Sequence, residues 1–226
     1  MKLTNVSKIY RIGTEKVVAL DNINLEVPKG EICCILGTSG SGKSTLLNLM
    51  AGLERPTKGN IVIKGKNIER MSENSLARFR QKYVGFVFQS YNLLPALTAL
   101  ENVSLPLVFR GVSKKVRNEK AKRILEQVGL GTHLKHKPNQ MSGGQQQRVG
   151  IARAFIGNPE IVFADEPTGN LDSKTTVEIM NLITGLAREN NQTLIIVTHD
   201  VNIAKYADRI VYILDGNIEK IEKPVK

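Results

Sequence analysis

The segment EICCILGTSGSGKSTLLNLMAG, residues 31–52, is the most informative part of the sequence about the fold. Residues 31–36 read as a short buried strand, and residues 43–51 carry the apolar spacing of a helix. Between them, residues 37–44 match the pattern G-x-x-x-x-G-K-S/T, which is specific when it links a strand to a helix. This context predicts a phosphate-binding loop, hereafter the P-loop, in a nucleotide-binding α/β fold.

The residue types of the P-loop explain how it would bind phosphate. Gly37, Gly40 and Gly42 allow the backbone to curl so that successive N–H groups point at phosphate oxygens. Lys43 is expected to reach the β- and γ-phosphates, and the Ser44 hydroxyl is expected to ligate Mg²⁺. The loop therefore predicts a nucleotide site that uses Mg²⁺.

A second apolar run, IVFA at residues 161–164, ends in two carboxylates. Asp165 and Glu166 would be carried to the sheet edge where ligands bind in open α/β folds. Asp165 is expected to hold Mg²⁺ directly or through water. Glu166 is expected to orient and deprotonate the attacking water, a contribution on the order of 10²–10⁴ in rate.

Two further strand ends carry polar side chains. Gln89 ends the run VGFVFQ, and His199 follows the run TLIIVT. Either residue alone would be an ordinary polar strand terminus. Because the carboxyl ends of parallel strands share one edge, we predict that Ser44, Gln89, Asp165 and His199 converge on one crevice.

Length and composition indicate a soluble globular protein. The 226 residues are 41% hydrophobic and 23% charged, enough for one large domain. No apolar run approaches the roughly 20 residues that span a bilayer, and the N-terminal residues lack a signal-peptide pattern. The only two cysteines, Cys33 and Cys34, are adjacent and are expected to be core residues of a cytosolic protein.

The formal net charge of +11 leaves several classes of partner open. Residues 110–137 hold nine Lys or Arg and two Glu, a net charge of +7 in one stretch. Such a stretch could contact nucleic acid or acidic lipid headgroups, or form a solvated surface.

Short β-rich runs alternate with helical patterns, which indicates a largely parallel sheet covered by helices. From about residue 92 to residue 139 the strand patterns vanish, which predicts an inserted helical subdomain. Strands are predicted at residues 31–36, 60–64, 83–88, 160–164, 193–198 and 208–214, and helices at residues 43–51, 114–128, 143–155, 175–189 and 201–206.

The motifs, in their order along the chain, resemble those of the ATP-binding cassette (ABC) ATPases. The resemblance covers essentially the whole chain. The stretch MSGGQQQ is similar to the family's signature LSGGQ, with Met141 in place of leucine. Thr38 stands where proline is commoner and Gly150 where alanine is usual, and neither change touches a phosphate-facing group. The resemblance implies an α/β fold with a P-loop NTPase-type, mostly parallel core, an N-terminal antiparallel β subdomain and an inserted α-helical subdomain.

The resemblance also implies one nucleotide-binding domain over residues 1–226, with an α/β core at about residues 1–91 and 158–226 and a helical subdomain at about residues 92–157. Tyr10 resembles the aromatic residue that stacks on adenine, Gln89 the Q-loop glutamine, and His199 the switch histidine. The stretch GNLD, residues 169–172, resembles the D-loop.

Three sets of site residues follow from the motifs and the resemblance. The catalytic set is Glu166, His199, Gln89 and Lys43. The metal set for Mg²⁺ is Ser44, Gln89 and Asp165. The ATP-binding set is Tyr10, Gly37, Thr38, Ser39, Gly40, Ser41, Gly42, Lys43, Ser44 and Thr45, together with Ser142, Gly143, Gly144 and Gln145.

In the family, two cassettes pack head to tail, and the signature of one covers the ATP held by the other. Ser142, Gly143 and Gly144 would present a hydroxyl and backbone N–H groups to a γ-phosphate, backed by a helix N-terminus. The resemblance therefore implies an ATP-dependent homodimer.

The stretch YNLLPALTALENVSLPL resembles the subgroup that powers lipoprotein release and macrolide or peptide export by mechanotransmission. This implies an ATPase subunit at the cytoplasmic face of the cell membrane, coupled to a separate integral-membrane permease. Leu93, Leu94, Pro95 and Leu97 lie where the family docks a helix of the membrane subunit, and core packing is the other interpretation.

A soluble, nucleic-acid-associated cassette ATPase is the alternative, to which the net charge points. The family's translation factors carry two cassettes, and its DNA-repair members carry a long coiled coil or zinc modules. This sequence has one cassette, no long heptad tract and no Cys/His cluster. We therefore expect no nucleic-acid partner. A small-molecule P-loop kinase would leave the SGGQ stretch unexplained.

Overall fold

The computed structural model describes residues 1–224. The chain divides into two compact units, Met1–Arg80 with Thr193–Lys226, and Gln81–Gln192. We call the first the P-loop unit and the second the signature unit, after the loops at residues 37–44 and 141–145. Among the described residues, no helix combines the length and the apolar character needed to cross a bilayer.

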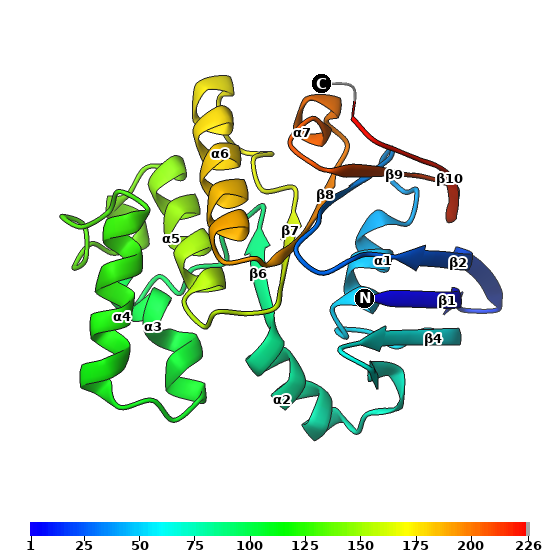
Figure 1. The fold of residues 1–226 in the computed structure, drawn as a ribbon, viewed down its shortest axis with the longest axis horizontal. Coiled ribbons are helices and arrows are strands. Elements are labelled where there is room, and N and C mark those ends of the chain that lie inside the picture. Colours follow the sequence, from blue (N-terminus) through cyan, green and yellow to red (C-terminus); the bar gives the residue numbers. More distant parts are fainter. Residues whose placement is uncertain (225–226) are drawn as a thin grey trace. The chain divides into compact units, whose positions relative to one another are not determined.

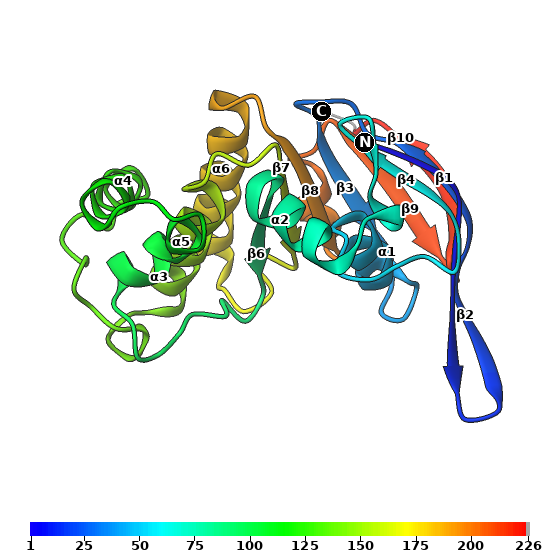
Figure 2. The same ribbon diagram turned by 90° about the horizontal axis from the view of Figure 1, so that it is seen from below.

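The P-loop unit contains an antiparallel sheet of strand order β2-β1-β4-β5 (Figure 1). The register of β1 with β4 runs to Ser7, while its register with β2 continues to Ile12. Figure 2 shows this hairpin extending past β4. The expected antiparallel β subdomain is thus confirmed, with the bounds β1 Lys2–Ile12, β2 Glu15–Glu26, β4 Lys58–Ile63 and β5 Lys66–Asn67.

The P-loop unit also contains parallel strands that carry the P-loop. Strand β3 (Ile32–Leu36) pairs in parallel with β8 (Thr193–Thr198) and β9 (Arg209–Leu214), and β10 (Asn217–Glu222) runs antiparallel to β9. Every residue of β3 and β8 is buried, as expected for parallel strands covered on both faces. Cys33 and Cys34 lie on β3 with no exposed surface, which confirms that they are core residues.

The helices of the P-loop unit are short. Helix α1 (Lys43–Met50) follows the P-loop, η1 (Ile68–Arg70) is a 3₁₀ turn, and α7 (Val201–Ala204) contacts β3 and β8. Helix α2 (Glu73–Tyr83) contains the boundary between the units. The sequence did not predict α2, because its polar residues bury only Leu76 and Phe79 and so give little apolar periodicity.

The signature unit pairs two parallel strands with a helical group. Strand β6 (Val84–Phe88) lies beside β7 (Ile161–Asp165), and α5 (Gly143–Phe155) packs against β6, α3, α4 and α6. Figure 1 draws α3, α4 and α5 in green as one group. The remaining bounds are α3 Ala99–Phe109, α4 Lys114–Gln127, η2 Pro138–Gln140 and α6 Ser173–Glu189.

Most predicted elements agree with the structure within two residues at their ends. Helix α6 begins at Ser173 rather than residue 175, because the Asp172 side chain accepts from the Thr175 N–H and acts as the N-cap. Helix α7 ends at Ala204, two residues earlier than predicted.

Candidate nucleotide site

The P-loop joins β3 to α1 with glycines at positions that require them. Gly40 and Gly42 have left-handed backbone conformations, with φ of 79° and 100°. A Cβ atom on Gly37 would lie 2.3 Å from the backbone oxygen of Ile213. Side chains at these positions would therefore distort the loop.

Two polar groups of the P-loop are buried in a way that suits an anionic ligand. Lys43 is 7% exposed, and its Nζ donates to the Thr38 carbonyl at 2.6 Å. Ser41 is 3% exposed, and its Oγ has no hydrogen-bond partner among the described residues. A buried unpaired hydroxyl and a buried ammonium in one loop fit phosphate oxygens. Thr38, Ser39 and Ser44 are exposed.

Tyr10 lies beside the P-loop in the same unit. Its hydroxyl donates to Glu54 Oε2 at 2.7 Å, and the Thr45 side chain lies close enough to offset part of the rise in the pKa of Tyr10 that burial causes. Glu54 also accepts from Asn48 Nδ2 at 3.0 Å and pairs with Lys8 Nζ at 3.1 Å. Burial raises the pKa of Tyr10, and Glu54 raises it further. Burial opposes ionisation of Glu54, but its hydrogen-bond donors lower its pKa.

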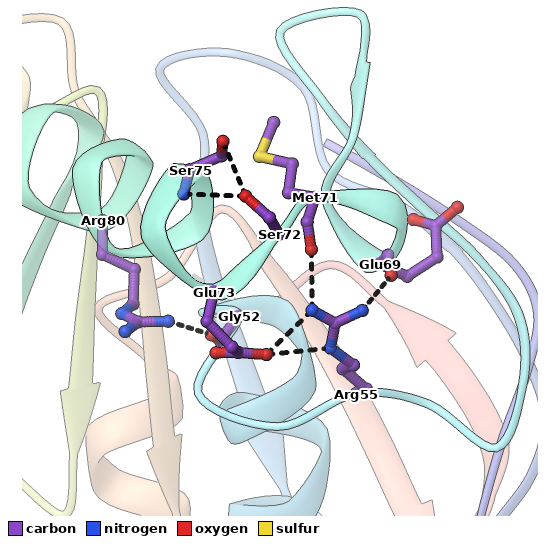
Figure 3. Close-up of polar contacts among 8 residues, drawn as sticks. All are labelled: Gly52, Arg55, Glu69, Met71, Ser72, Glu73, Ser75 and Arg80. Atoms are coloured by element: carbon purple, nitrogen blue, oxygen red, sulfur yellow. Dashed lines mark hydrogen bonds and ion pairs between the residues drawn. The ribbon is translucent and has the colours of Figure 1, made fainter.

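Arg55 anchors the loop that carries Glu54. Its guanidinium donates to Glu73 Oε1 at 2.8 and 3.1 Å, to the Glu69 carbonyl at 3.1 Å and to the Met71 carbonyl at 2.7 Å (Figure 3). Sequence reasoning missed both Glu54 and Arg55. Tyr10 and Glu54 are 44 positions apart, so no local pattern could reveal their contact.

His199 shares an edge with the P-loop. Strands β3 and β8 are parallel, and Leu36 pairs with Thr198. Gly37 and His199 therefore leave the sheet at the same edge, and the His199 side chain is exposed there. The P-loop unit thus places the P-loop and His199 at one sheet edge, and it also contains Tyr10.

The signature unit brings together the other strand-end residues. Phe88 of β6 pairs with Asp165 of β7, so Gln89 and Glu166 follow at one edge. Glu166 has φ of 44°, a left-handed conformation that costs a non-glycine residue about 1 kcal/mol or more and is common at functional sites. A Cβ atom on Gly169 would lie 2.6 Å from Gln89 Nε2, so Gln89 lies against the predicted D-loop.

No protein-only metal site exists among residues 1–224, since no three His, Cys, Asp or Glu side chains form a group that could hold a metal ion. Mg²⁺ typically combines one or two protein ligands with water and substrate phosphates. The predicted donors Ser44, Gln89 and Asp165 all offer oxygen atoms, which is the ligand type that Mg²⁺ prefers.

The signature loop is an ordered helix N-terminus. Ser142 is the N-cap of α5: its Oγ accepts from the Gln145 N–H at 3.3 Å, and Gln145 Oε1 accepts from the Ser142 N–H at 2.9 Å. A polar cavity of about 370 Å³ opens beside this capping box. It is lined by Ser142, Gly143, Gly144, Gln145, Arg148, Asn170, Leu171, Asp172, Thr175 and Glu178.

Fold and loops together define a P-loop nucleotide-binding cassette. The family model described as ABC transporter matches residues 20–169. An uncharacterized ABC transporter ATP-binding protein of Thermotoga maritima is 53% identical over 99% of this chain and 95% of that protein. The chain belongs to the ABC transporter family.

Two further relatives extend this comparison. The dimeric cassette MJ0796 of Methanocaldococcus jannaschii, in a post-hydrolysis state bound to ADP and Pi, has a TM-score of 0.91 and 46% identity, over 100% of this chain and 99% of that chain. The macrolide export ATP-binding/permease protein MacB of a Shewanella species is 43% identical over 100% of this chain and 35% of that protein.

This chain is therefore an ATP-binding, ATP-hydrolysing subunit of an ABC transporter, as the motifs predicted. The nucleic-acid alternative finds no support among these relatives.

Proposed function

We propose that this chain acts as a head-to-tail homodimer with two composite ATP sites and drives a separate integral-membrane permease from the cytoplasmic face of the membrane. One observation carries the proposal: the signature loop and the D-loop of a single unit line one polar cavity of about 370 Å³. The signature loop is a second loop suited to an anion, besides the P-loop. Its presence is explained if it binds the ATP of another chain.

Each site residue has a role in this proposal. Lys43 binds the β- and γ-phosphates, Glu166 deprotonates the attacking water, and His199 contacts the γ-phosphate as reaction proceeds. Mg²⁺, held by Ser44, Gln89 and Asp165 together with ATP, would neutralise charge on the phosphates.

Tyr10 stacks on the adenine in this proposal. The ammonium of Lys8 lies 4.9 Å from the centroid of the Tyr10 ring, so we place the adenine on the opposite face. The backbone N–H groups of residues 37–45 hold the phosphates.

The signature loop contacts the partner's γ-phosphate. Because Ser142 Oγ accepts from the Gln145 N–H, its own O–H remains available to donate outward. The N–H groups of Gly143 and Gly144 lie in the first turn of α5, where the helix dipole favours an anion. The dimeric state of the MJ0796 cassette supports this arrangement.

We further propose that residues 1–226 act as one nucleotide-binding domain whose helical subdomain, about residues 92–157, carries the signature and docks the permease. The mutual packing of α3, α4 and α5 in this range supports it. Leu94 is 46% exposed. Its backbone N–H donates to Oδ1 of Asn102, and Asn102 has no exposed surface. An apolar side chain held outward on an anchored loop suits a docking contact.

Export or lipoprotein-release coupling is the transport mode we propose. Support comes from the similarity to MacB, whose name describes macrolide export, and from the YNLLPALTALENVSLPL stretch.

The test is the variant Glu166→Gln, which should bind ATP but nearly cease to hydrolyse it. Since ATP would bind most tightly in the closed pair, mass action should convert monomer to dimer. Gel filtration with and without ATP measures this, and Lys43→Ala in the same background is the control that should stay monomeric. Near-normal hydrolysis by Glu166→Gln would contradict the assigned role.

A further inference from the structure

The hydrogen bonds around Gln145 fix the orientation of its side-chain amide. The Ser142 backbone N–H can only donate, and it lies 2.9 Å from the Gln145 amide oxygen Oε1. The other amide atom, Nε2, must then be the NH₂ group. That NH₂ lies 3.2 Å from Nε2 of His133, which belongs to the loop between α4 and η2.

This orientation determines the protonation of His133. An NH₂ group is a donor only, so this contact is a hydrogen bond only in the tautomer whose Nε2 accepts and carries no proton. That tautomer bears its proton on Nδ1, which lies 3.0 Å from the Thr132 hydroxyl oxygen and can donate to it. In that tautomer the hydrogen bonds are continuous: Ser142 donates to Gln145, Gln145 to His133, and His133 to Thr132.

The His133 ring is itself held in place. Its backbone N–H donates to the Leu130 carbonyl at 2.9 Å, and its carbonyl accepts from the His136 N–H at 3.0 Å. The His136 ring packs beside it, with centroids 4.9 Å apart. His133 therefore presents a fixed acceptor to the signature loop.

We propose that His133 is a positioning residue for the signature loop: its unprotonated Nε2 locks the Gln145 amide, which in turn holds the Ser142 backbone and hydroxyl in the phosphate-binding orientation. The inference rests on the proposed function, because it gives the signature loop the role of binding the partner's ATP. Without an acceptor at position 133 the amide can rotate, and the capping box loses one of its two hydrogen bonds.

The first test reads the tautomer of His133 in the full chain without nucleotide, so it does not depend on dimer formation. Long-range ¹H–¹⁵N spectra of ¹⁵N-histidine-labelled protein at pH 7.5 distinguish Nδ1–H from Nε2–H rings. The chain has three histidines, so comparison with His133→Gln assigns the signal. We expect the Nδ1–H tautomer, and a ring protonated on Nε2 would overturn the proposal.

The second test measures ATP-dependent dimerisation in the Glu166→Gln background by sedimentation. His133→Ala removes the acceptor, and His133→Gln supplies an amide oxygen in its place. We expect His133→Ala to raise the dimer dissociation constant on the order of tenfold, because two signature loops each lose a hydrogen bond. His133→Gln should restore the constant to within about twofold. Lys135→Ala, at an exposed position of the same loop, is the matched control and should leave it unchanged.

The outcomes separate the two proposals. If the Glu166→Gln chain with His133 intact fails to dimerise with ATP, the proposed function is wrong. If it dimerises and His133→Ala does so equally well, His133 positions nothing and the inference is wrong. Circular dichroism of each variant verifies that the fold is retained, and His133→Gln keeps the inference testable if His133→Ala is unstable.

Discussion

Arg153, in the last turn of α5, donates a hydrogen bond to the backbone carbonyl of Tyr91 at 2.7 Å and another to the carbonyl of Asn92. Tyr91 and Asn92 both have left-handed backbones, with φ of 57° and 48°. A Cβ atom on Gly143, at the other end of α5, would lie 2.8 Å from the Tyr91 hydroxyl. Contacts at both ends of α5 therefore hold the segment that follows Gln89 against this helix, within the signature unit.

Replacing Arg153 with lysine should uncouple this segment from α5. Lysine keeps the charge but lacks the planar fork whose two nitrogens donate to both carbonyls, so the part-buried Tyr91 carbonyl loses its donor in that geometry. We expect ATP turnover to fall between about tenfold and a hundredfold, since small misplacements of catalytic groups carry costs of this size. Nucleotide affinity, measured by fluorescence titration, should change by less than about threefold because the P-loop is untouched.

The matched control is Arg123→Lys on α4, where an exposed arginine pairs with Glu119 one turn away. It should leave turnover unchanged. Equal turnover of the Arg153 and Arg123 variants would mean that the hydrogen bonds from Arg153 to the Tyr91 and Asn92 carbonyls have no catalytic role.

Glu54 should affect ATP binding more than turnover. In Glu54→Ala the Tyr10 hydroxyl loses its acceptor, so the ring is less well placed to stack on adenine. Stacking contributes about 1–3 kcal/mol per base, so Tyr10→Ala should raise KM for ATP about fivefold or more, and Glu54→Ala by a smaller factor. Steady-state kinetics should show kcat nearly unchanged in both. A loss confined to kcat would contradict the assignment of Tyr10 to the base.

Leu94 and Leu53 offer a matched pair for the docking proposal, because they are 46% and 48% exposed and lie in different units. Leu94→Asp would place an unpaired charge in the permease contact, which should weaken assembly about 30-fold, or about 2 kcal/mol. Leu53→Asp should assemble normally. Co-purification with the permease measures both, and the isolated ATPase activity of both should stay close to that of the parent. Normal assembly of Leu94→Asp would remove Leu94 from the docking surface.

Sequence patterns predicted the site features whose residues are close neighbours in the chain. The P-loop, the Asp165–Glu166 pair and the signature each lie within a few consecutive residues, and each has a motif whose chemistry can be read directly. The contacts of Tyr10 with Glu54 and of Arg153 with Tyr91 join residues 44 and 62 positions apart. Only the folded chain reveals such pairs, because no spacing rule connects them.

The start of α6 and the role of His133 illustrate a second limit. The sequence contains Asp172 and His133, but the N-cap and the acceptor role depend on which backbone N–H or amide each side chain meets. Composition and periodicity carry no information on such hydrogen-bond partners.

The existing thiols allow a direct test of the two-chain site. Cys33 and Cys34 are fully buried, and burial raises the pKa of the Cys33 thiol to about 12, so both should be inert to thiol reagents in the folded chain. Engineered cysteines on the exposed residues Ser39 and Ser142 should then be the only reactive groups. The unmodified chain, treated in the same way, verifies this.

Cross-linking between Ser39→Cys in one chain and Ser142→Cys in another, both in the Glu166→Gln background, determines whether the signature loop reaches the nucleotide of another chain. If the signature loop binds the partner's ATP, a short bifunctional thiol reagent should join the two chains when ATP is present. The product should disappear without ATP or with Lys43→Ala in both chains. A chain that carries both cysteines should likewise link to its partner. Efficient linking within a monomer would contradict the account, because both loops would then serve the nucleotide of one chain.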